Sequence, residues 1–358
     1  MTRSLIRVLD LFAGAGGLTA GFHQASKRFR SVSAVEMDLA AAASYEATFG
    51  AGIVHAQSIQ DWLAEDDVPT NVDIIVGGPP CQGFSTLGKQ DVEDDRNSLW
   101  HQYAETIVKA QPKYFVVENV AAFAKSRQFQ DFKEAIEPDG ILSDYDFDYD
   151  VLNAADFGAF QSRKRAVLIG HRRDLAAPGI PKPTHSPKQH RTVEEALKGV
   201  PWTTTSNDLP QDRTVEFGGK VFAGSFTPGE LHLGRDYAQL SLDRFAKIPA
   251  GGNRFNLPER LKAECWKKHT TGSGDVMGRL HWKKPSVTIR TEFFKPEKGR
   301  YLHPVADRAI THYEAAILQG FPFDHKFVGS KTAIARQIGN AVPIPLGKAI
   351  AGQLLKLF

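Results

Sequence analysis

The sequence predicts an α/β protein with a parallel sheet, followed by a smaller, irregular, β-rich domain. Through the first third of the chain, short apolar runs alternate with helical stretches, which is typical of a helix-covered parallel sheet. Near residue 175 the prolines cluster and the periodicity is lost. The length of 358 residues suggests two domains, or one domain with an insertion. We therefore expect a first domain over residues 1–180, a second over 181–300, and a return to the first over 301–358.

The elements of the first domain follow from the apolar pattern. Strands are expected over residues 5–12, 31–35, 53–55, 72–76 and 114–117, with helices over 17–27, 39–48 and 98–110 and near Trp62. From Asp144 to Asp150 acids alternate with aromatic residues, which predicts a half-buried strand with a solvated acidic face. This strand would pair with a strand over 166–170 as a hairpin. The chain ends in helices over 310–319 and 345–358.

Composition excludes several classes of protein. Lys plus Arg total 44 and Asp plus Glu total 41, and 42% of residues are hydrophobic, which is ordinary for a soluble globular protein of this size and leaves its function open. Two cysteines cannot form a disulfide framework, so we expect a reducing cytoplasm. No apolar run approaches the roughly 18 residues that a membrane helix needs. The net charge of +3 does not by itself indicate a nucleic-acid partner.

A glycine-rich loop joins the first strand to the first helix. Phe12, Gly14, Gly16 and Gly17 lie in this loop, and Glu36 ends the next strand about 20 residues further on. Glycines let a ligand approach the backbone, a helix N-terminus offers free N–H groups, and an acid at this spacing binds ribose hydroxyls. The alternative reading is a tight turn with a surface glutamate, and a nicotinamide-dependent oxidoreductase would use the same arrangement.

A second loop carries a cysteine on a rigid turn. Residues 77–85 read Gly-Gly-Pro-Pro-Cys-Gln-Gly-Phe-Ser, and Cys81 follows a predicted strand. A cysteine at the carboxyl end of a parallel strand faces the ligand crevice of such a fold, where an exposed thiolate can act as a nucleophile. A lone cysteine is more commonly a small buried apolar residue. We keep that reading for Cys265 only, because glycine and proline surround Cys81.

Taken in order, six blocks resemble those of the DNA (cytosine-5) methyltransferase family. They are residues 10–17, 77–85, 118–120, 161–165, 319–322 and 337–343. The resemblance spans nearly the whole chain and implies a Rossmann-like sheet that binds S-adenosylmethionine, joined to a target-recognition domain. It implies that Cys81 adds to cytosine carbon 6, that Glu118 contacts ring nitrogen 3 and the amine, and that Arg163 holds the oxygen at position 2. Arg165 would either support Arg163 or contact the adjacent phosphate. The alternatives are a strand-end acid for Glu118 and a solvated basic face for the arginines.

The resemblance also implies the contacts of the methyl donor. Phe12 would stack near the adenine, Gly14 and Gly16 would line the methionine part, and Glu36 would bind the ribose. Further members of this pocket are Met37, Pro79, Asn340 and Val342. The family often places an Asp-Ile pair after the third strand, where this chain has Ser58 and Ile59. Either the serine substitutes there, or Asp61 or Asp73 is the acid.

The implied substrate is double-stranded DNA, whose cytosine must leave the stack to be attacked. Residues 82–97 resemble the family's mobile loop, with Gly83 and Gly88 as hinges, and we expect Asp91, Glu93, Asp94 and Asp95 to face away from phosphates. Candidate base readers are Arg244, Arg254 and Arg260. Candidate phosphate contacts are Lys188, His190, Arg191, Lys267, Lys268 and His269.

Three alternatives to a DNA methyltransferase are a transfer-RNA cytosine methyltransferase, a non-catalytic DNA-binding relative and an oxidoreductase. A non-catalytic relative would be expected to lack Cys81, Glu118 or Arg163, and an oxidoreductase leaves the Pro-Pro-Cys turn unexplained. We therefore expect the modification enzyme of a restriction system, or a solitary relative. It would be a cytoplasmic, nucleoid-associated monomer without a metal, and a cognate restriction endonuclease is a possible partner.

Overall fold

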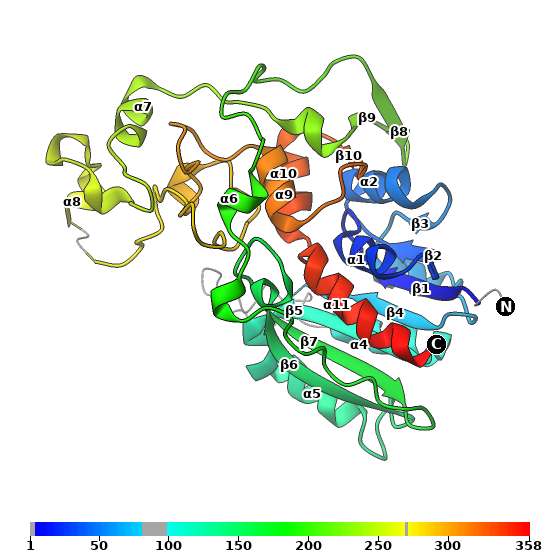
Figure 1. Ribbon diagram of the computed structural model, residues 1–358. Coiled ribbons are helices and arrows are strands. Elements are labelled where there is room, and N and C mark those ends of the chain that lie inside the picture. The colour runs from blue at the N-terminus through cyan, green and yellow to red at the C-terminus, as the bar shows by residue number, and fades with distance from the viewer. Residues whose placement is uncertain (1–3, 81–98, 269–270) are drawn as a thin grey trace.

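A mostly parallel sheet forms the centre of the protein. The computed structural model describes residues 4–80, 99–268 and 271–358. The main sheet has the strand order β3-β2-β1-β4-β5-β7-β6 (Figure 1). The five strands from β3 to β5 in this order run parallel to one another. Strand β7 is antiparallel to β5, and β6 is antiparallel to β7. The strands are β1 (Ile6–Leu11), β2 (Phe29–Val35), β3 (Val54–His55), β4 (Ile74–Gly77), β5 (Tyr114–Val120), β6 (Tyr145–Asn153) and β7 (Lys164–Arg172).

Helices cover both faces of this sheet because the side chains of each buried strand alternate between two cores. Leu9 and Leu11 of β1 pack on one side with α3, α4 and α5, whereas Ile6 and Val8 pack on the other side with α1 and α11 (Figure 1). The helices of this part are α1 (Gly17–Ala25), α2 (Leu39–Phe49), α3 (Ile59–Ala64), α4 (Leu99–Ala110), α5 (Arg127–Ala135), α9 (His312–Gln319), α10 (Lys331–Asn340) and α11 (Ile344–Leu354).

The predicted strands and helices of the first domain are present with small shifts of their ends, and the structure adds two helices. The sequence analysis did not predict α5 or α10. The acid-aromatic strand is β6, which pairs with β7 as expected. Asp148 and Asp150 are exposed there, as is Tyr149, whose ring lies against Phe129 of α5. The strand is therefore an edge strand with a solvated acidic side.

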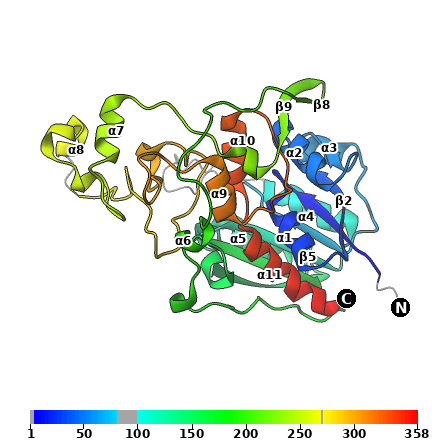
Figure 2. The same ribbon diagram turned by 45° about the horizontal axis from the view of Figure 1, so that its top comes forward.

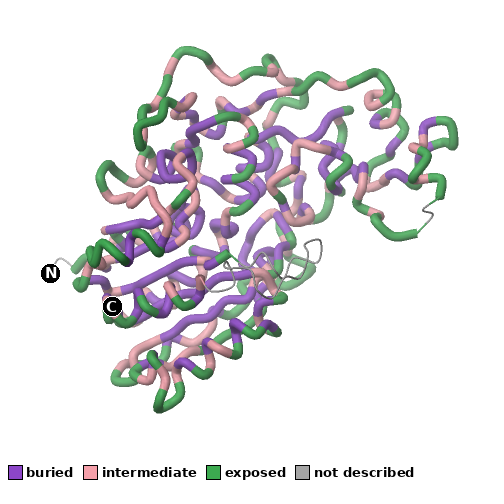
Figure 3. The backbone as a smooth tube through the Cα atoms, turned by 180° about the vertical axis from the view of Figure 1, so that it is seen from behind, coloured by how far each residue is buried: buried purple, intermediate pink, exposed green. Residues whose placement is uncertain are grey.

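The segment after residue 180 is irregular, as predicted, but contains less strand than expected. It holds β8 (Thr214–Phe217), β9 (Lys220–Phe226), α6 (Val193–Ala196), α7 (Gln239–Phe245) and α8 (Glu264–Lys268), and β9 pairs with β10 (Phe327–Val328). Figure 2 shows α7 and α8 standing away from the sheet. Seen from behind, the buried backbone is concentrated in the sheet and the helices beside it, and exposed backbone dominates the outer loops (Figure 3).

Among the described residues, the structure contains no helix that is both long and apolar enough to cross a membrane.

Candidate active site

The carboxyl ends of three neighbouring parallel strands bring the predicted blocks together. The glycine loop follows β1, the Pro-Pro turn follows β4, and Glu118 lies near the end of β5. Leu11 pairs with Gly77, and Gly77 pairs with Val117. Ligands of open α/β sheets bind at this edge. The three blocks are therefore adjacent because β1, β4 and β5 are adjacent.

The glycine loop is a tight turn with open space beside it. Phe12 has φ 55°, Gly14 has φ 55° and Gly16 has φ 83°. A Cβ on Gly16 would lie 2.1 Å from Cε2 of Phe49, so only glycine fits there, whereas a Cβ on Gly14 would meet no atom within 4 Å. The backbone at Gly14 thus borders free volume, and Phe12 is partly buried against the core of the sheet.

Glu36 is fixed by backbone donors beside this space. Its carboxylate accepts hydrogen bonds from the N–H of Gly14 (2.8 Å) and of Asp38 (2.7 Å). Burial raises the pKa of Glu36, and these N–H groups oppose that rise. Each carboxylate oxygen keeps acceptor capacity for a further donor. The structure therefore holds Glu36 where a ligand with hydroxyl groups could reach it.

The closing block borders the same loop. A Cβ on Gly17 would lie 2.9 Å from Cβ of Ala341 and 3.1 Å from the carbonyl oxygen of Val342. Val342 is buried and Asn340 is exposed. Residues about 325 positions apart in the sequence therefore flank one loop.

The remaining predicted cofactor residues differ in their exposure and in their hydrogen bonds. The side chain of Met37 is 73% exposed, whereas Ile59 is buried in the core. Ser58 caps α3 by accepting from the N–H of Asp61 and donates to the Asp61 carboxylate. Asp73 is wrong as the adenine-binding acid, because it accepts from the N–H of Arg7 and pairs with Lys113 at the opposite end of the sheet.

A buried carboxyl group with no role predicted from the sequence lies in β1, next to the glycine loop. Asp10, at the end of β1, is 1% exposed and accepts a hydrogen bond of 2.6 Å from the hydroxyl of Thr19. Burial raises the pKa of Asp10 to about 7. The Thr19 oxygen lies 3.0 Å from the hydroxyl of Tyr45 on α2. This polar contact ties β1, α1 and α2 together, and its only sequence signal was an acid inside an apolar strand.

The Pro-Pro turn packs against the end of β5. Asn119 donates a hydrogen bond of 2.8 Å from Nδ2 to the carbonyl of Pro79, which is buried. A Cβ on Gly78 would lie 2.9 Å from the Glu118 carbonyl oxygen. Asn119 is a second residue that the sequence analysis left without a role. Cys81, the predicted mobile loop and its four acids fall within residues 81–98 and lie outside the described residues.

Glu118 and two arginines form a buried charged cluster. Nε of Arg165 lies 2.8 Å from Oε1 of Glu118, as an ion pair without hydrogen-bond geometry. Arg163 is 4% exposed and donates 2.7 Å from Nη1 to the carbonyl of Ile289. Burial, together with the charge of Arg165, lowers the pKa of Arg163 to about 9.

Two polar atoms of this cluster have no hydrogen-bond partner among residues 4–80, 99–268 and 271–358. They are Oε1 of Glu118, an acceptor, and Nε of Arg163, a donor. Buried polar groups without a partner are uncommon and call for an explanation such as a ligand. The cluster therefore offers one acceptor and one donor to a polar molecule at the end of β5.

One of the three predicted base readers is corrected. Arg254 is 3% exposed and donates to the carbonyls of Ser273 and Gly272, so its guanidinium holds loops together and is not available to read bases. Arg244 is partly buried, donates from Nε to the carbonyl of Leu261 and lies over the ring of Trp266. Its role as a base reader stays a prediction. Arg260 is exposed.

Of the predicted phosphate contacts, some pair or stack with other side chains of the protein and others are exposed. His190 pairs with Asp156 at 2.7 Å, and Arg191 stacks on Phe160. Lys267 pairs with Glu264, Lys188 and Lys268 are exposed, and His269 lies outside the described residues. The prediction that Cys265 is a buried apolar residue is wrong, because Cys265 is exposed.

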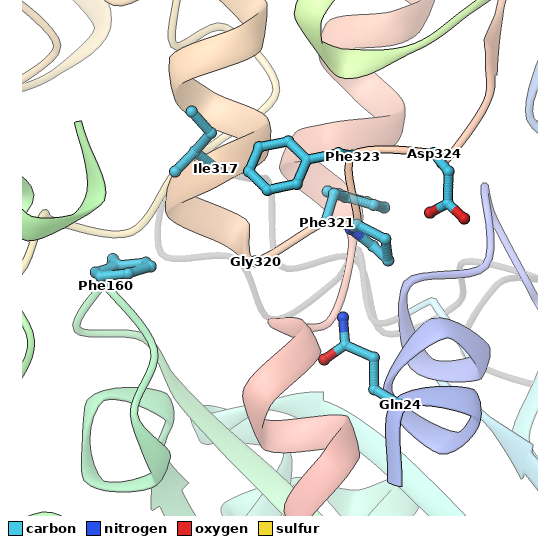
Figure 4. Close-up of a pocket in the computed structure, with 8 residues that line it drawn as sticks. Gln24, Phe160, Ile317, Gly320, Phe321, Phe323 and Asp324 are labelled. Carbon is cyan, nitrogen blue, oxygen red and sulfur yellow. The ribbon is translucent and has the colours of Figure 1, made fainter. Parts of the chain in front are cut away.

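An apolar pocket of about 520 Å³ lies apart from the predicted site residues. Its walls come from the C-terminal end of α1, the loop before Arg163 and the turn after α9 (Figure 4). Phe323 at its rim is 74% exposed. Of the predicted catalytic and cofactor residues that the structure describes, none lines this pocket.

Comparison with known proteins gives a consistent result. The model of the C-5 cytosine-specific DNA methylase family matches residues 6–356. The type II methyltransferase M.XorII of Xanthomonas oryzae is 34% identical, and the match covers 97% of this chain and 84% of that protein. The type II methyltransferase M1.HphI of Haemophilus parahaemolyticus is also 34% identical, with 98% and 86% covered.

Solved structures agree on the fold. A protein described as a DNA modification methyltransferase encoded within an E. coli prophage has a TM-score of 0.71 at 26% identity, covering 98% of this chain and 99% of its own. The Dnmt2 methyltransferase of S. pombe has a TM-score of 0.58 at 16% identity, with 98% of both chains covered. At that identity the second likeness supports the fold alone.

Proposed function

This chain belongs to the C-5 cytosine-specific DNA methylase family, and from that premise we propose that it transfers a methyl group from S-adenosylmethionine to carbon 5 of a cytosine flipped out of a specific duplex sequence. The observation that carries the proposal is the cluster of Glu118, Arg163 and Arg165 beside the Pro-Pro turn. Within the described part of the chain, Oε1 of Glu118 lies in an ion pair but accepts no hydrogen bond, and Nε of Arg163 has no acceptor. An acceptor and a donor of this kind suit the edge of a cytosine.

The proposed chemistry starts at Cys81, assigned by the resemblance of its loop. The thiolate adds to carbon 6, a proton is taken up at ring nitrogen 3, and carbon 5 becomes an enamine carbon that can attack a methyl group. After methyl transfer, nitrogen 3 gives up the proton that it took up, a base removes the proton of carbon 5, and release of the thiolate restores the aromatic ring. Glu118 would hold the proton at nitrogen 3, and Arg163 would stabilise charge on the oxygen at position 2.

An adenosyl methyl donor fits the residues around the glycine loop. Gly14 borders free space, the Glu36 carboxylate is oriented by two backbone N–H groups, and Val342 closes the side of the loop. We propose that Glu36 binds the ribose hydroxyls and that Phe12, Met37 and Asn340 complete the pocket. Glu36 orients the donor, and the buried loop backbone excludes water. When bound, the donor supplies an electrophilic methyl group.

The proposed partner is double-stranded DNA. The segment from residue 181 to 300 carries the exposed Arg260, Lys188 and Lys268, which suit contacts with phosphates or bases. By analogy with the type II relatives, we also propose that a restriction endonuclease acts on the same sequence.

The test is transfer of a labelled methyl group from S-adenosylmethionine to duplex DNA, compared with transfer RNA. We expect DNA to be labelled and Cys81→Ala to abolish labelling. Bisulfite sequencing of plasmid from expressing cells then identifies the modified sequence. Preferential labelling of transfer RNA, or wild-type rates from Cys81→Ala, would contradict the proposal.

A further inference from the structure

Two glutamines form a fully buried pair between the proposed cytosine side and the proposed cofactor side. Gln161 and Gln319 are both 0% exposed. Nε2 of Gln161 donates a hydrogen bond of 2.5 Å to Oε1 of Gln319 and lies 3.3 Å from the carbonyl of Leu318. Burying two amides is costly unless every donor and acceptor is paired. Packing alone therefore does not explain why two amide side chains occupy these buried positions.

On one side the pair is hydrogen-bonded to Ile289, the residue whose carbonyl accepts a hydrogen bond from Arg163. Oε1 of Gln161 accepts from the N–H of Ile289 at 3.2 Å, and Arg163 donates to the carbonyl of Ile289 at 2.7 Å. The neighbouring backbone continues this contact, because the N–H of Ser162 donates to the carbonyl of Ser286. A shift of Gln161 would therefore move Ile289 and, with it, the buried guanidinium.

On the other side the pair holds the closing block. Nε2 of Gln319 donates 2.5 Å to the carbonyl of Ile338 and 3.4 Å to the carbonyl of Ala341. Ala341 is the residue that lies 2.9 Å from where a Cβ of Gly17 would be. Gln319 therefore fixes the backbone that flanks the glycine loop.

The hydrogen bonds run in one direction through both amides. They lead from the N–H of Ile289 to Gln161, from Gln161 to Gln319, and from Gln319 to the carbonyl of Ile338. Each position needs one acceptor and one donor on the same side chain, and an amide provides both. A carboxylate or an apolar side chain at either position breaks the chain.

We propose that Gln161 and Gln319 are positioning residues that couple the arginine at the cytosine to the backbone around the methyl donor. The proposal rests on the proposed function and deepens it. Neither glutamine needs to touch a reactant. Through the two glutamines, the residues that bind the cytosine and the backbone that binds the methyl donor are held in a fixed relative position. This position determines how carbon 5 and the methyl group are aligned.

The test is a double-mutant cycle with Gln161→Met and Gln319→Met, which keep the volume and remove the hydrogen bonds. We measure the dissociation constant of S-adenosylmethionine and the single-turnover rate on duplex DNA. Gln161→Met should weaken cofactor binding, and Gln319→Met should slow methyl transfer about 10- to 100-fold, since small misplacements cost that much. The double variant should lose about 10-fold less than the product of the single effects, because directly bonded residues are coupled.

The matched control is Gln337, a third buried glutamine, which donates to the carbonyl of Val328 and accepts from Ser44. Gln337→Met should lower Tm, and its effects should multiply with those of Gln161→Met. If Gln161→Met fails to fold, Gln161→Glu keeps an acceptor for Ile289, removes the bonds from Nε2 to Gln319 and to the carbonyl of Leu318, and buries a carboxyl group.

The inference is overturned if the loss in the double variant equals the product of the losses in Gln161→Met and Gln319→Met. It is also overturned if Gln161→Met binds S-adenosylmethionine with unchanged affinity. A wild-type enzyme that labels no DNA would instead overturn the proposed function, and the binding cycle would still report the coupling.

Discussion

One carboxylate beside two guanidinium groups determines the electrostatics at the end of β5. Glu118 faces Arg165 at 2.8 Å, and Arg163 is buried nearby with its Nη1 on the Ile289 carbonyl. Breaking a buried ion pair by removing one partner is costly, because the other charge is left uncompensated. Glu118 thus has a structural reason to be present, and any catalytic role must be separated from it.

Glu118→Gln is expected to slow methyl transfer about 10²- to 10⁴-fold, the range over which a positioned acid or base contributes. It should also lower Tm. The measurement is the single-turnover rate at a temperature where the variant is folded.

The control for Glu118→Gln is Glu314→Gln. Glu314 is buried and accepts two hydrogen bonds, of 2.8 and 2.7 Å, from Arg308. This variant should lower Tm as well, yet keep the transfer rate per folded molecule within about 2-fold of wild type, since it loses an ion pair away from the proposed chemistry. Equal rate losses in both variants would make Glu118 a structural residue only.

At the scale of elements, the turn between β1 and α1 depends on one glycine for two reasons. Gly16 combines φ 83° with contact to Phe49, whose Cε2 would lie 2.1 Å from an added Cβ. Gly52 has a similar φ of 77° but no atom within 4 Å of an added Cβ. The two positions therefore separate backbone strain from crowding.

Gly52→Ala should cost about 1–2 kcal/mol of unfolding free energy, the price of a left-handed alanine. Gly16→Ala should cost more and should weaken binding of S-adenosylmethionine, because α2 or the loop must move. Denaturant unfolding and cofactor titration of both variants check this. The idea fails if Gly16→Ala binds the cofactor as wild type does.

The elements also show what the sequence could predict. Buried strands such as β1 and β4 are continuous apolar runs, so their existence and order were readable. Helix α5 is rich in polar residues (RQFQDFKEA) and was missed. The segment around α7 and α8 could not be predicted, because buried arginines and a small apolar cluster contributed by loops and short helices hold it together, and neither leaves a periodic pattern in the sequence. Arg279 donates to the carbonyls of Ile248, Phe245, His303 and Ala306.

The same limit applies to the site. Block positions predicted that Glu118 and Arg163 lie near the Pro-Pro turn, and Asn119 and Glu118 do contact that turn. Burial was not readable, so Arg254 was taken for a base reader. The glutamine pair joins residues 158 positions apart, and a single sequence holds no signal for such a contact.

Across the whole molecule, the last 60 residues contain buried histidines that pack among aromatic side chains. His312 bonds to the Lys331 carbonyl and stacks on Phe294, and His325 lies among Phe49, Phe321 and Phe327. Burial lowers the pKa of His303 and of His312 to about 4 and that of His325 to about 3. The folded protein therefore keeps these rings neutral.

This burial makes the protein sensitive to mild acid. The unfolded chain takes up protons below a pKa of about 6.5, whereas the folded chain does so only near 4 or below, so stability is complete above pH 6.5 and falls as the pH drops toward 4. Each such histidine contributes a loss of about 1.4 kcal/mol per pH unit in this window. Tm should stay level from pH 7.5 to about 6.5 and fall from there to pH 5, and His325→Phe, which places another aromatic ring in the cluster, should reduce the slope of that fall. His101→Phe at an exposed position should leave the slope unchanged. An unchanged slope in His325→Phe would show that the His325 ring already carries a proton in the folded state.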